Sequence, residues 1–163
     1  MFAPSARPRP RAADRDARYK QFLAVHDKLP LRVNRGIRLA EYAARTDDYI
    51  TAVIWTVSAT EALLNTDRPK LRRQFVQRSA ALGGELGVNG VTADVANAIY
   101  TARSESVHGA VPNIQDREQA VLELAAMQRL VRAALRRAVE VETFRDAFRD
   151  DSSVRARLPV SLT

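Results

Sequence analysis

The sequence predicts an all-α protein, built as an up-and-down bundle of about five to six helices. Through most of the chain, apolar residues recur at the three- and four-residue spacing of one helix face. No stretch alternates as a strand does, and no glycine-rich phosphate loop interrupts the pattern. With 163 residues, of which 46% are hydrophobic, the chain is long enough to close a single core. We therefore expect one helical domain over residues 13–150.

The amino-terminal part divides at about residue 12. Residues 1–12 contain three prolines between arginines, which prevent a helix, and the segment has little apolar surface to bury. We therefore expect it to be a disordered tail or a linker. The first helix is expected from Ala13 to just before Pro30, and the second over residues 31–45. The side chains that define the apolar side of the first helix are Tyr19, Phe22, Leu23 and His26. We interpret His26 as a core or boundary histidine.

The middle of the chain carries two further helices. Asp47 or Asp48 can cap the third, whose broad apolar face around Trp55 predicts a position at the centre of the core. Asp67 followed by Pro69 is typical of a helix start, so the fourth helix is expected from there until the glycines at 83–84 loosen its end.

The last two expected helices flank a turn. Thr92 is expected to cap the fifth helix, and Gly109 to end it in the left-handed conformation, with His108 in the last turn. Asp116 opens a long helical stretch, in which a break is expected near residues 139–143. Residues 151–163 are expected to be a loose carboxyl-terminal tail.

Charge and composition limit the partners. The 26 basic and 19 acidic residues give a net charge of +7, which favours an acidic partner such as nucleic acid, although residues 7–20 alone carry +4 of it. An arginine-rich composition is also typical of GC-rich genomes. Without cysteine, and with two histidines, the chain predicts no disulfide, no structural metal and no cofactor. No apolar run resembles a signal or a membrane span, so we expect a cytoplasmic protein without a membrane partner.

The segment from Arg103 to His108 is the part of the sequence that most clearly indicates a chemical function. Positions five apart on an ideal helix differ by about 140° in direction, so these two side chains can share a cleft only because the helix ends beside them. Arginine forks onto phosphate oxygens, and histidine moves a proton near neutral pH. Ser104 lies close enough to orient the His108 ring. The alternative is structural, with a histidine that complements the helix dipole and a solvated arginine.

Residues 100–109, Tyr-Thr-Ala-Arg-Ser-Glu-Ser-Val-His-Gly, resemble the signature of the HEPN superfamily, in which histidine follows arginine after four to six residues. Residues 57–64 and 71–82 resemble the glutamate-leucine helix and the arginine-bearing helix that come before the signature in ApeA-like HEPN domains. The resemblance covers roughly residues 31–140. It implies a helical bundle that pairs about a two-fold axis, so that two arginine-histidine motifs meet over one groove.

The resemblance implies a metal-independent endoribonuclease that leaves 2′,3′-cyclic phosphate ends, in a toxin or antiviral defence system. His108 would transfer the proton and Arg103 would stabilise the phosphate charge. Ser104 stands where many nuclease members have asparagine, aspartate or histidine. The supporting residues would be Ser104, Glu105, Glu61 and Tyr100, and the RNA-binding residues Arg78 and Arg73.

Each supporting assignment has a structural alternative. Glu61, on an otherwise apolar helix, would hold Arg103 or another basic residue, or would lie at the rim. Tyr100 and Trp55 stand alone and not in a basic stripe, so we interpret them as core or interface aromatics and not as base-stacking platforms. Arg78 and the cluster around Arg73, which comprises Arg68, Lys70, Arg72 and Arg73, would otherwise form solvated helix faces.

A second function class is also compatible with these residues. It is a non-catalytic HEPN module that dimerises, or binds nucleotide or RNA, within a larger sensing protein, and the Pro/Arg-rich start resembles a linker to such a protein. A plain helical scaffold is a third. For the nuclease, the expected partners are a second copy, RNA, and an inhibitory antitoxin or an upstream sensing domain.

Overall fold

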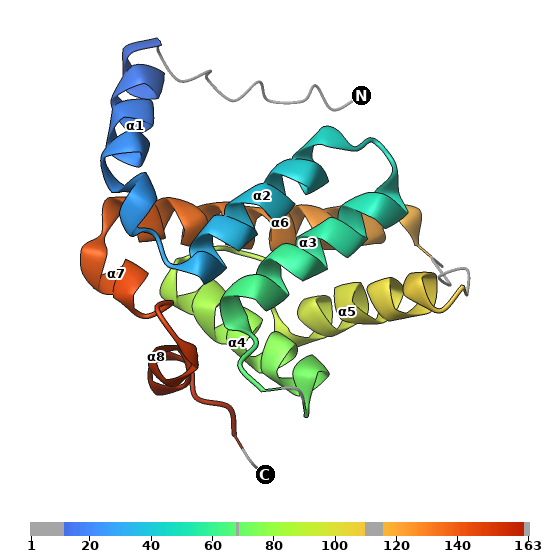
Figure 1. Ribbon diagram of the computed structural model, residues 1–163. Helices are drawn as coiled ribbons and strands as arrows, with labels where there is room; N and C mark the ends of the chain where they lie inside the picture. Colours follow the sequence, from blue (N-terminus) through green and yellow to red (C-terminus); the bar gives the residue numbers. More distant parts are fainter. Residues whose placement is uncertain (1–11, 68, 110–115, 162–163) are drawn as a thin grey trace.

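The computed structural model describes residues 12–67, 69–109 and 116–161, and within these ranges the chain forms helices and no strands (Figure 1). The predicted all-α class is confirmed, but the described ranges contain eight α-helices and one 3-10 helix, where about five to six helices were expected. They are α1 (Ala12–Val25), η1 (His26–Lys28), α2 (Leu31–Arg45), α3 (Tyr49–Leu64), α4 (Leu71–Glu85), α5 (Ala93–Val107), α6 (Arg117–Glu140), α7 (Glu142–Asp146) and α8 (Asp151–Arg157).

Helix α3 lies at the centre of the core, as its apolar sequence predicts. It contacts α2, α4, α5 and α6, and half of its sixteen residues are buried. Glu61 is its only charged side chain. A single carboxylate on the most buried helix needs a partner, because an isolated charge away from water is costly.

Helix α2 runs beside α3, with α6 crossing behind both (Figure 1). Gly36 allows this close approach: a Cβ atom there would lie 3.2 Å from Cδ2 of Leu135 and 3.3 Å from Cγ of Leu63. Glycine inside a helix costs about 1 kcal/mol relative to alanine. The tight packing of α2 against α3 and α6 explains why α2 contains a glycine at this point.

The predicted helix boundaries are confirmed where a local signal sets them. Asp48 accepts a hydrogen bond from the Thr51 backbone N–H at 2.7 Å and so caps α3. Thr92 caps α5 and Asp116 caps α6 in the same way. Gly109 follows α5 with φ of 79°, the left-handed conformation expected of it. The expected break after the long helix falls at Val141, between α6 and α7.

Two boundaries differ from the prediction. Helix α4 begins at Leu71, after Lys70 in the left-handed conformation, because Gln74 folds back and donates to the carbonyls of Asp67 and Pro69. The first helix ends at Val25, and His26 lies exposed in η1, where its ring meets the edge of the Phe22 ring. The interpretation of residues 1–12 as a tail or linker concerns mostly residues outside the described ranges.

The carboxyl-terminal segment is not the loose tail that the sequence predicts. Residues Asp151–Arg157 form α8, and both Val154 and Leu158 are buried in the main core. Asp150 caps α8 by accepting a hydrogen bond from the Ser153 backbone N–H at 2.8 Å. The buried apolar area and the cap together explain why this segment is ordered.

Arginines fasten α8 to the carboxyl end of α3. Arg32 of α2 pairs with Asp151 and donates to the Asn65 carbonyl at 2.7 Å, while Arg78 of α4 donates to the carbonyls of Leu64 and Leu158. We call Arg32, Arg78, Asp151 and Leu158 the carboxyl-end clasp. Cations at this end also complement the helix dipole of α3.

Helix α1 projects away from the rest of the bundle (Figure 1), and Tyr19 and Leu23 on it are largely exposed. None of the helices in the described ranges is long and apolar enough to cross a membrane.

Candidate functional site

Helix α5 brings one turn of the proposed motif against α3. Tyr100 and Arg103 lie three positions apart and therefore on neighbouring parts of one helix face. Ala96 and Ile99 are buried and anchor α5 in the core. The Arg103 guanidinium reaches Glu61 of α3, with Nη2 and Oε2 3.8 Å apart. Of the two alternatives for Glu61, the structure therefore contains the contact with Arg103.

Glu61 lies in a half-buried position surrounded by donors and cations, with 19% of its side chain exposed. Burial raises the pKa of Glu61, and the charge of Arg103, a hydrogen bond with Tyr100 and the charge of Arg35 act in the opposite direction. The Asn65 side-chain amide also donates to Oε1 at 3.4 Å. Burial is the largest of these effects, so the site favours the neutral carboxyl more than water does.

The Arg103 guanidinium has fewer partners than its burial requires. Its side chain is 28% exposed, and the 3.8 Å separation from Glu61 is an ion pair but too long for a hydrogen bond. Its Nε atom is buried and makes no hydrogen bond within the described structure. An arginine has five N–H donors, so Arg103 keeps unused hydrogen-bonding capacity beside a partly solvent-accessible surface.

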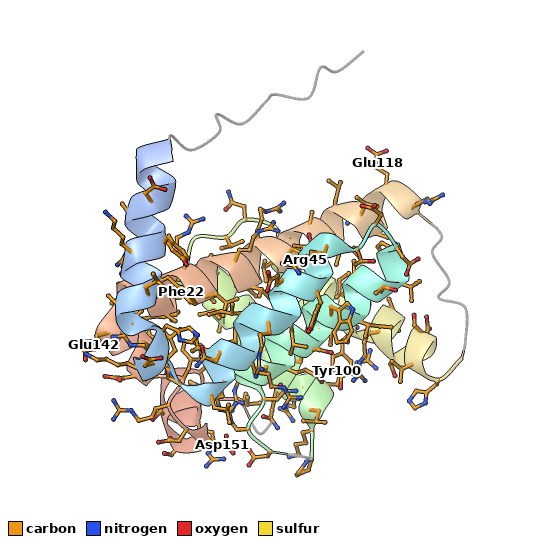
Figure 2. All side chains as sticks on the ribbon, turned by 45° about the horizontal axis from the view of Figure 1, so that its top comes forward. Phe22, Arg45, Tyr100, Glu118, Glu142 and Asp151 are labelled. Atoms are coloured by element: carbon orange, nitrogen blue, oxygen red, sulfur yellow. The ribbon has the colours of Figure 1, made fainter. Side chains whose placement is uncertain are left out.

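Tyr100 links this pair to the core. Its ring lies 5.1 Å from the Phe75 ring, centroid to centroid, and burial raises the pKa of its hydroxyl, with the charge of Glu61 acting in the same direction. Figure 2 labels Tyr100 beside the contact between α3 and α5. This position supports the interpretation of Tyr100 as a core aromatic whose hydroxyl also contacts the polar site.

Two further arginines, which the sequence did not assign to the site, add positive charge around Glu61 and Tyr100. Arg35 of α2 acts on Glu61, and Arg72 of α4 donates to the Asn97 side chain at 2.8 Å and to Thr101 Oγ1 at 3.1 Å. Arg72 also lowers the pKa of Tyr100, against the dominant effect of burial. In the sequence, both arginines lie on helix faces that are expected to be exposed to solvent. The packing of the helices is what brings their charge to this site.

His108 lies apart from this cluster. It is the exposed residue that ends α5, and its backbone N–H donates to the Ser104 carbonyl at 3.2 Å. Within residues 12–67, 69–109 and 116–161, no hydrogen bond or ion pair joins its ring to Arg103 or Ser104. Ser104 and Glu105 are partly exposed on the same last turns. One chain thus joins Arg103, Glu61 and Tyr100, and leaves His108 open to solvent nearby.

Arg78 is not a surface residue, so both sequence interpretations of it are wrong. It is 2% exposed, and besides the two backbone carbonyls of the clasp it donates to Gln74 Oε1 at 2.8 Å and to Thr66 Oγ1 at 3.1 Å. Its Nε and Nη1 donate inside the fold, so its burial and its partners support a structural role and not the predicted RNA contact. Arg73 is partly exposed on α4, while Arg68 of the same predicted cluster lies outside the described residues.

Comparison with family models, curated proteins and solved structures found no match to this chain. The resemblance of residues 100–109 to the HEPN signature therefore stays a hypothesis.

Proposed function

We propose that this chain is a metal-independent endoribonuclease of the HEPN type, active as a two-fold dimer, which cleaves RNA to 2′,3′-cyclic phosphate ends. The observation that carries the proposal is the under-coordinated Arg103 guanidinium, which pairs with Glu61 of α3. Arg103 lies near the end of α5, the helix that finishes at the exposed His108. A half-buried cation with unused donors, five residues before a solvent-exposed imidazole on the same helix, suits a phosphodiester substrate.

The reaction needs one base, one acid and one cation. The imidazole of His108 takes the proton of a ribose 2′-hydroxyl as the 2′-oxygen attacks the adjacent phosphorus. Arg103 stabilises the extra negative charge on the phosphorane oxygens. The bond from phosphorus to the 5′-oxygen then breaks, and a protonated imidazole gives its proton to that oxygen. The products are a 2′,3′-cyclic phosphate and a 5′-hydroxyl end.

A dimer supplies the second imidazole, because His108 is the only histidine of the motif in each chain. The end of the bundle where α5 finishes and α6 begins (Figure 1) supports such pairing. Val107 beside His108, and Val121 and Leu122 near the start of α6, are each more than half exposed. Apolar side chains gathered at one end favour burial against a second copy.

The net charge of +7 supports a polyanionic substrate. A role as a toxin or antiviral effector in the cytoplasm, silenced by an antitoxin or triggered by a sensing domain, follows from the same resemblance. Arg72 and Arg73 of α4 are the best candidates for added RNA contacts. Arg72 is exposed and held in place by Asn97 and Thr101, next to Tyr100.

The alternative function is a non-catalytic HEPN module that dimerises or binds RNA or nucleotide for a larger protein. One observation favours it, which is that Glu61 engages Arg103 while His108 makes no side-chain contact with that pair among the described residues. In that case, Arg103 would hold a phosphate without cleavage, and His108 would only end the helix.

The deciding experiment incubates labelled single-stranded RNA in excess EDTA with the wild type, His108→Ala, Arg103→Met and the matched control His26→Ala. The control removes the other exposed histidine of the chain. We expect cyclic-phosphate ends from the wild type and the control, and a loss of at least about 100-fold from the other two variants. RNA binding without cleavage, by protein whose dimer is verified by analytical ultracentrifugation, would favour the non-catalytic module.

A further inference from the structure

Two aromatic side chains meet on the outer face of α2 and α3, and neither is part of the hydrophobic core. Trp55 stands alone in the sequence, but the fold places Tyr42 of α2 beside it. The two ring centroids are 5.2 Å apart, and the ring planes are tilted by 45°. Tyr42 is 51% exposed and Trp55 is partly exposed. Exposed aromatic surface of this kind is typical of a binding site. We call Tyr42 and Trp55 the aromatic pair.

The aromatic pair and Arg103 are joined by a partly exposed strip of α3. Six residues form this strip within about 120° around the helix, and they are Thr51, Ile54, Trp55, Ser58, Glu61 and Ala62. Trp55 lies at the edge beside α2, and Glu61 lies at the other edge, where it contacts Arg103 of α5. The six positions from Trp55 to Glu61 correspond to a rise of about 9 Å, which is roughly the length of two to three stacked nucleotides.

Arginines of α2 give the strip a positive border. Arg35, Arg38 and Tyr42 follow at intervals of three and four, so they lie on one side of α2. Arg38 is exposed, and no hydrogen bond or ion pair joins it to another residue in the described ranges. The charge of Arg35 acts on Glu61. Glu41, the one acidic residue of α2, is paired with an arginine of the same helix. The border therefore favours an anionic strand.

We propose that the aromatic pair stacks on an unpaired base of the RNA substrate, close to the nucleotide whose phosphate lies at Arg103. Proteins bind single strands in this way, with aromatic rings that stack on bases beside cations that follow the backbone. In a duplex, the bases are stacked on one another, so the aromatic pair selects single-stranded RNA. This inference rests on the proposed function, because it names the form of RNA that the site around Arg103 accepts.

The fluorescence of the chain tests this inference directly, because Trp55 is its single tryptophan. The full-length chain is titrated with a single-stranded 2′-O-methyl oligouridylate, whose blocked 2′-oxygen prevents cleavage, and with the same backbone without bases. The anisotropy of a dye at the end of each oligomer measures binding. We expect saturable quenching of Trp55 by the oligouridylate, and at least about tenfold weaker binding of the baseless oligomer. A 2′-O-methyl duplex should leave the emission of Trp55 unchanged.

Three outcomes would overturn the aromatic pair as a base site. Binding of the oligouridylate without a change in Trp55 emission would place the RNA elsewhere and leave the proposed ribonuclease standing. Equal affinity for the oligomers with and without bases, or quenching by the duplex, would show that unpaired bases are not recognised. A shift of Trp55 emission when the protein alone is diluted would show that a second copy covers the pair. Absence of both binding and RNA cleavage would overturn the proposed function, and this inference with it.

Variants of exposed tyrosines locate the base on the aromatic pair. Tyr42→Leu should weaken oligouridylate binding about tenfold, whereas Tyr42→Phe, which keeps the ring, should stay within about twofold of the wild type. Tyr19→Leu is the matched control, because Tyr19 is also largely exposed but lies on α1. Equal affinities of Tyr42→Leu and Tyr19→Leu would contradict the proposal.

Two further measurements separate stacking from charge and from catalysis. Arg38→Gln should weaken the oligomers with and without bases alike, by about threefold, and the control Arg137→Gln, exposed on α6, should weaken neither. In RNA cleavage, Tyr42→Leu should raise KM about tenfold and leave kcat within about twofold, because a neighbouring base is stacked equally before and during the reaction. A fall in kcat at unchanged KM would be incompatible with a role in substrate binding.

Discussion

Two arginines that contact the last turns of the central helix α3 differ in how the fold uses them. Arg78, in the carboxyl-end clasp, is almost fully buried and donates to four acceptors: the carbonyls of Leu64 and Leu158, Gln74 and Thr66. Arg103, between α5 and α3, keeps one carboxylate at 3.8 Å and a buried Nε without an acceptor.

The comparison teaches that burial alone does not mark a functional arginine. A buried guanidinium that donates to several acceptors inside the fold, as Arg78 does through Nε and Nη1, holds the structure together. A guanidinium with unused donors near solvent gains more from an incoming phosphate than it contributes to the empty fold. Arg78 is therefore structural, and Arg103 is the residue to test in function.

Replacing Arg78 should have the largest effect on stability. Arg78→Met leaves the carbonyls of Leu64 and Leu158 without their donor, so the free energy of unfolding should fall by about 3 kcal/mol. Urea denaturation followed by circular dichroism measures this. The exposed Arg38 gives the control Arg38→Met, expected within about 0.5 kcal/mol of the wild type. Similar effects of the two variants would show that the hydrogen bonds of Arg78 in the clasp do not stabilise the fold.

Replacing Arg103 should separate stability from function. Arg103→Met removes a long ion pair but also removes a buried donor without an acceptor, so these effects oppose each other. We expect the free energy of unfolding to change by less than about 1 kcal/mol, while RNA cleavage or binding is lost. A loss of stability as large as that of Arg78→Met would show that Arg103 is also a structural arginine, and the proposed difference between the two residues would then be wrong.

Replacing Glu61 should reveal a pH dependence. Because the pKa of Glu61 is raised in the folded state, its favourable contribution is complete below the ordinary value of 4.5 and is lost as pH rises through the raised pKa. Glu61→Gln, which stays neutral, should therefore have a higher melting temperature than the wild type at pH 7, and this advantage should shrink toward pH 4. A lower melting temperature at pH 7 would show that the ion pair with Arg103 outweighs burial.

The smallest expected effect concerns the cap of α8 beside the clasp. Hydrogen bonds from the Ser152 hydroxyl and from the Ser153 backbone N–H lower the pKa of Asp150 to about 2. The stabilising contribution of its charge is present above 3.8 and is lost as pH falls toward 2. Helical Cα chemical shifts of residues 151–157 should decline over this window, and in Asp150→Asn they should not. Parallel declines in both proteins would assign the change to other carboxylates.

Local signals in the sequence were sufficient for most of the helices. The caps Asp48, Thr92 and Asp116 act on backbone groups three positions away, and the left-handed Gly109 acts on the turn just before it. Such effects depend on neighbours in the sequence, and a sequence displays them directly.

Long-range contacts account for what the sequence did not predict. Val154 and Leu158 are isolated apolar residues in a charged segment, and their burial depends on the core that α8 meets. Arg78 lies in a helix of mixed polarity, and one of its acceptors is eighty positions away. A carboxylate on an apolar helix marked Glu61 as unusual, but the chain offers many arginines, and only the packing of α5 on α3 selects Arg103.

The glycine that brings α2 close to α3 has a consequence for the charges around Glu61. Arg35, whose charge acts on that carboxyl, directly precedes Gly36, where an added Cβ atom would lie 3.3 Å from Cγ of Leu63 on α3. The absence of a side chain at Gly36 therefore lets α2 lie close to α3, and this affects the distance between the Arg35 charge and the Glu61 carboxyl. Any larger residue there would press on Leu63 and Leu135 and move the cation outward, so the size of one uncharged residue helps to set the acidity of Glu61.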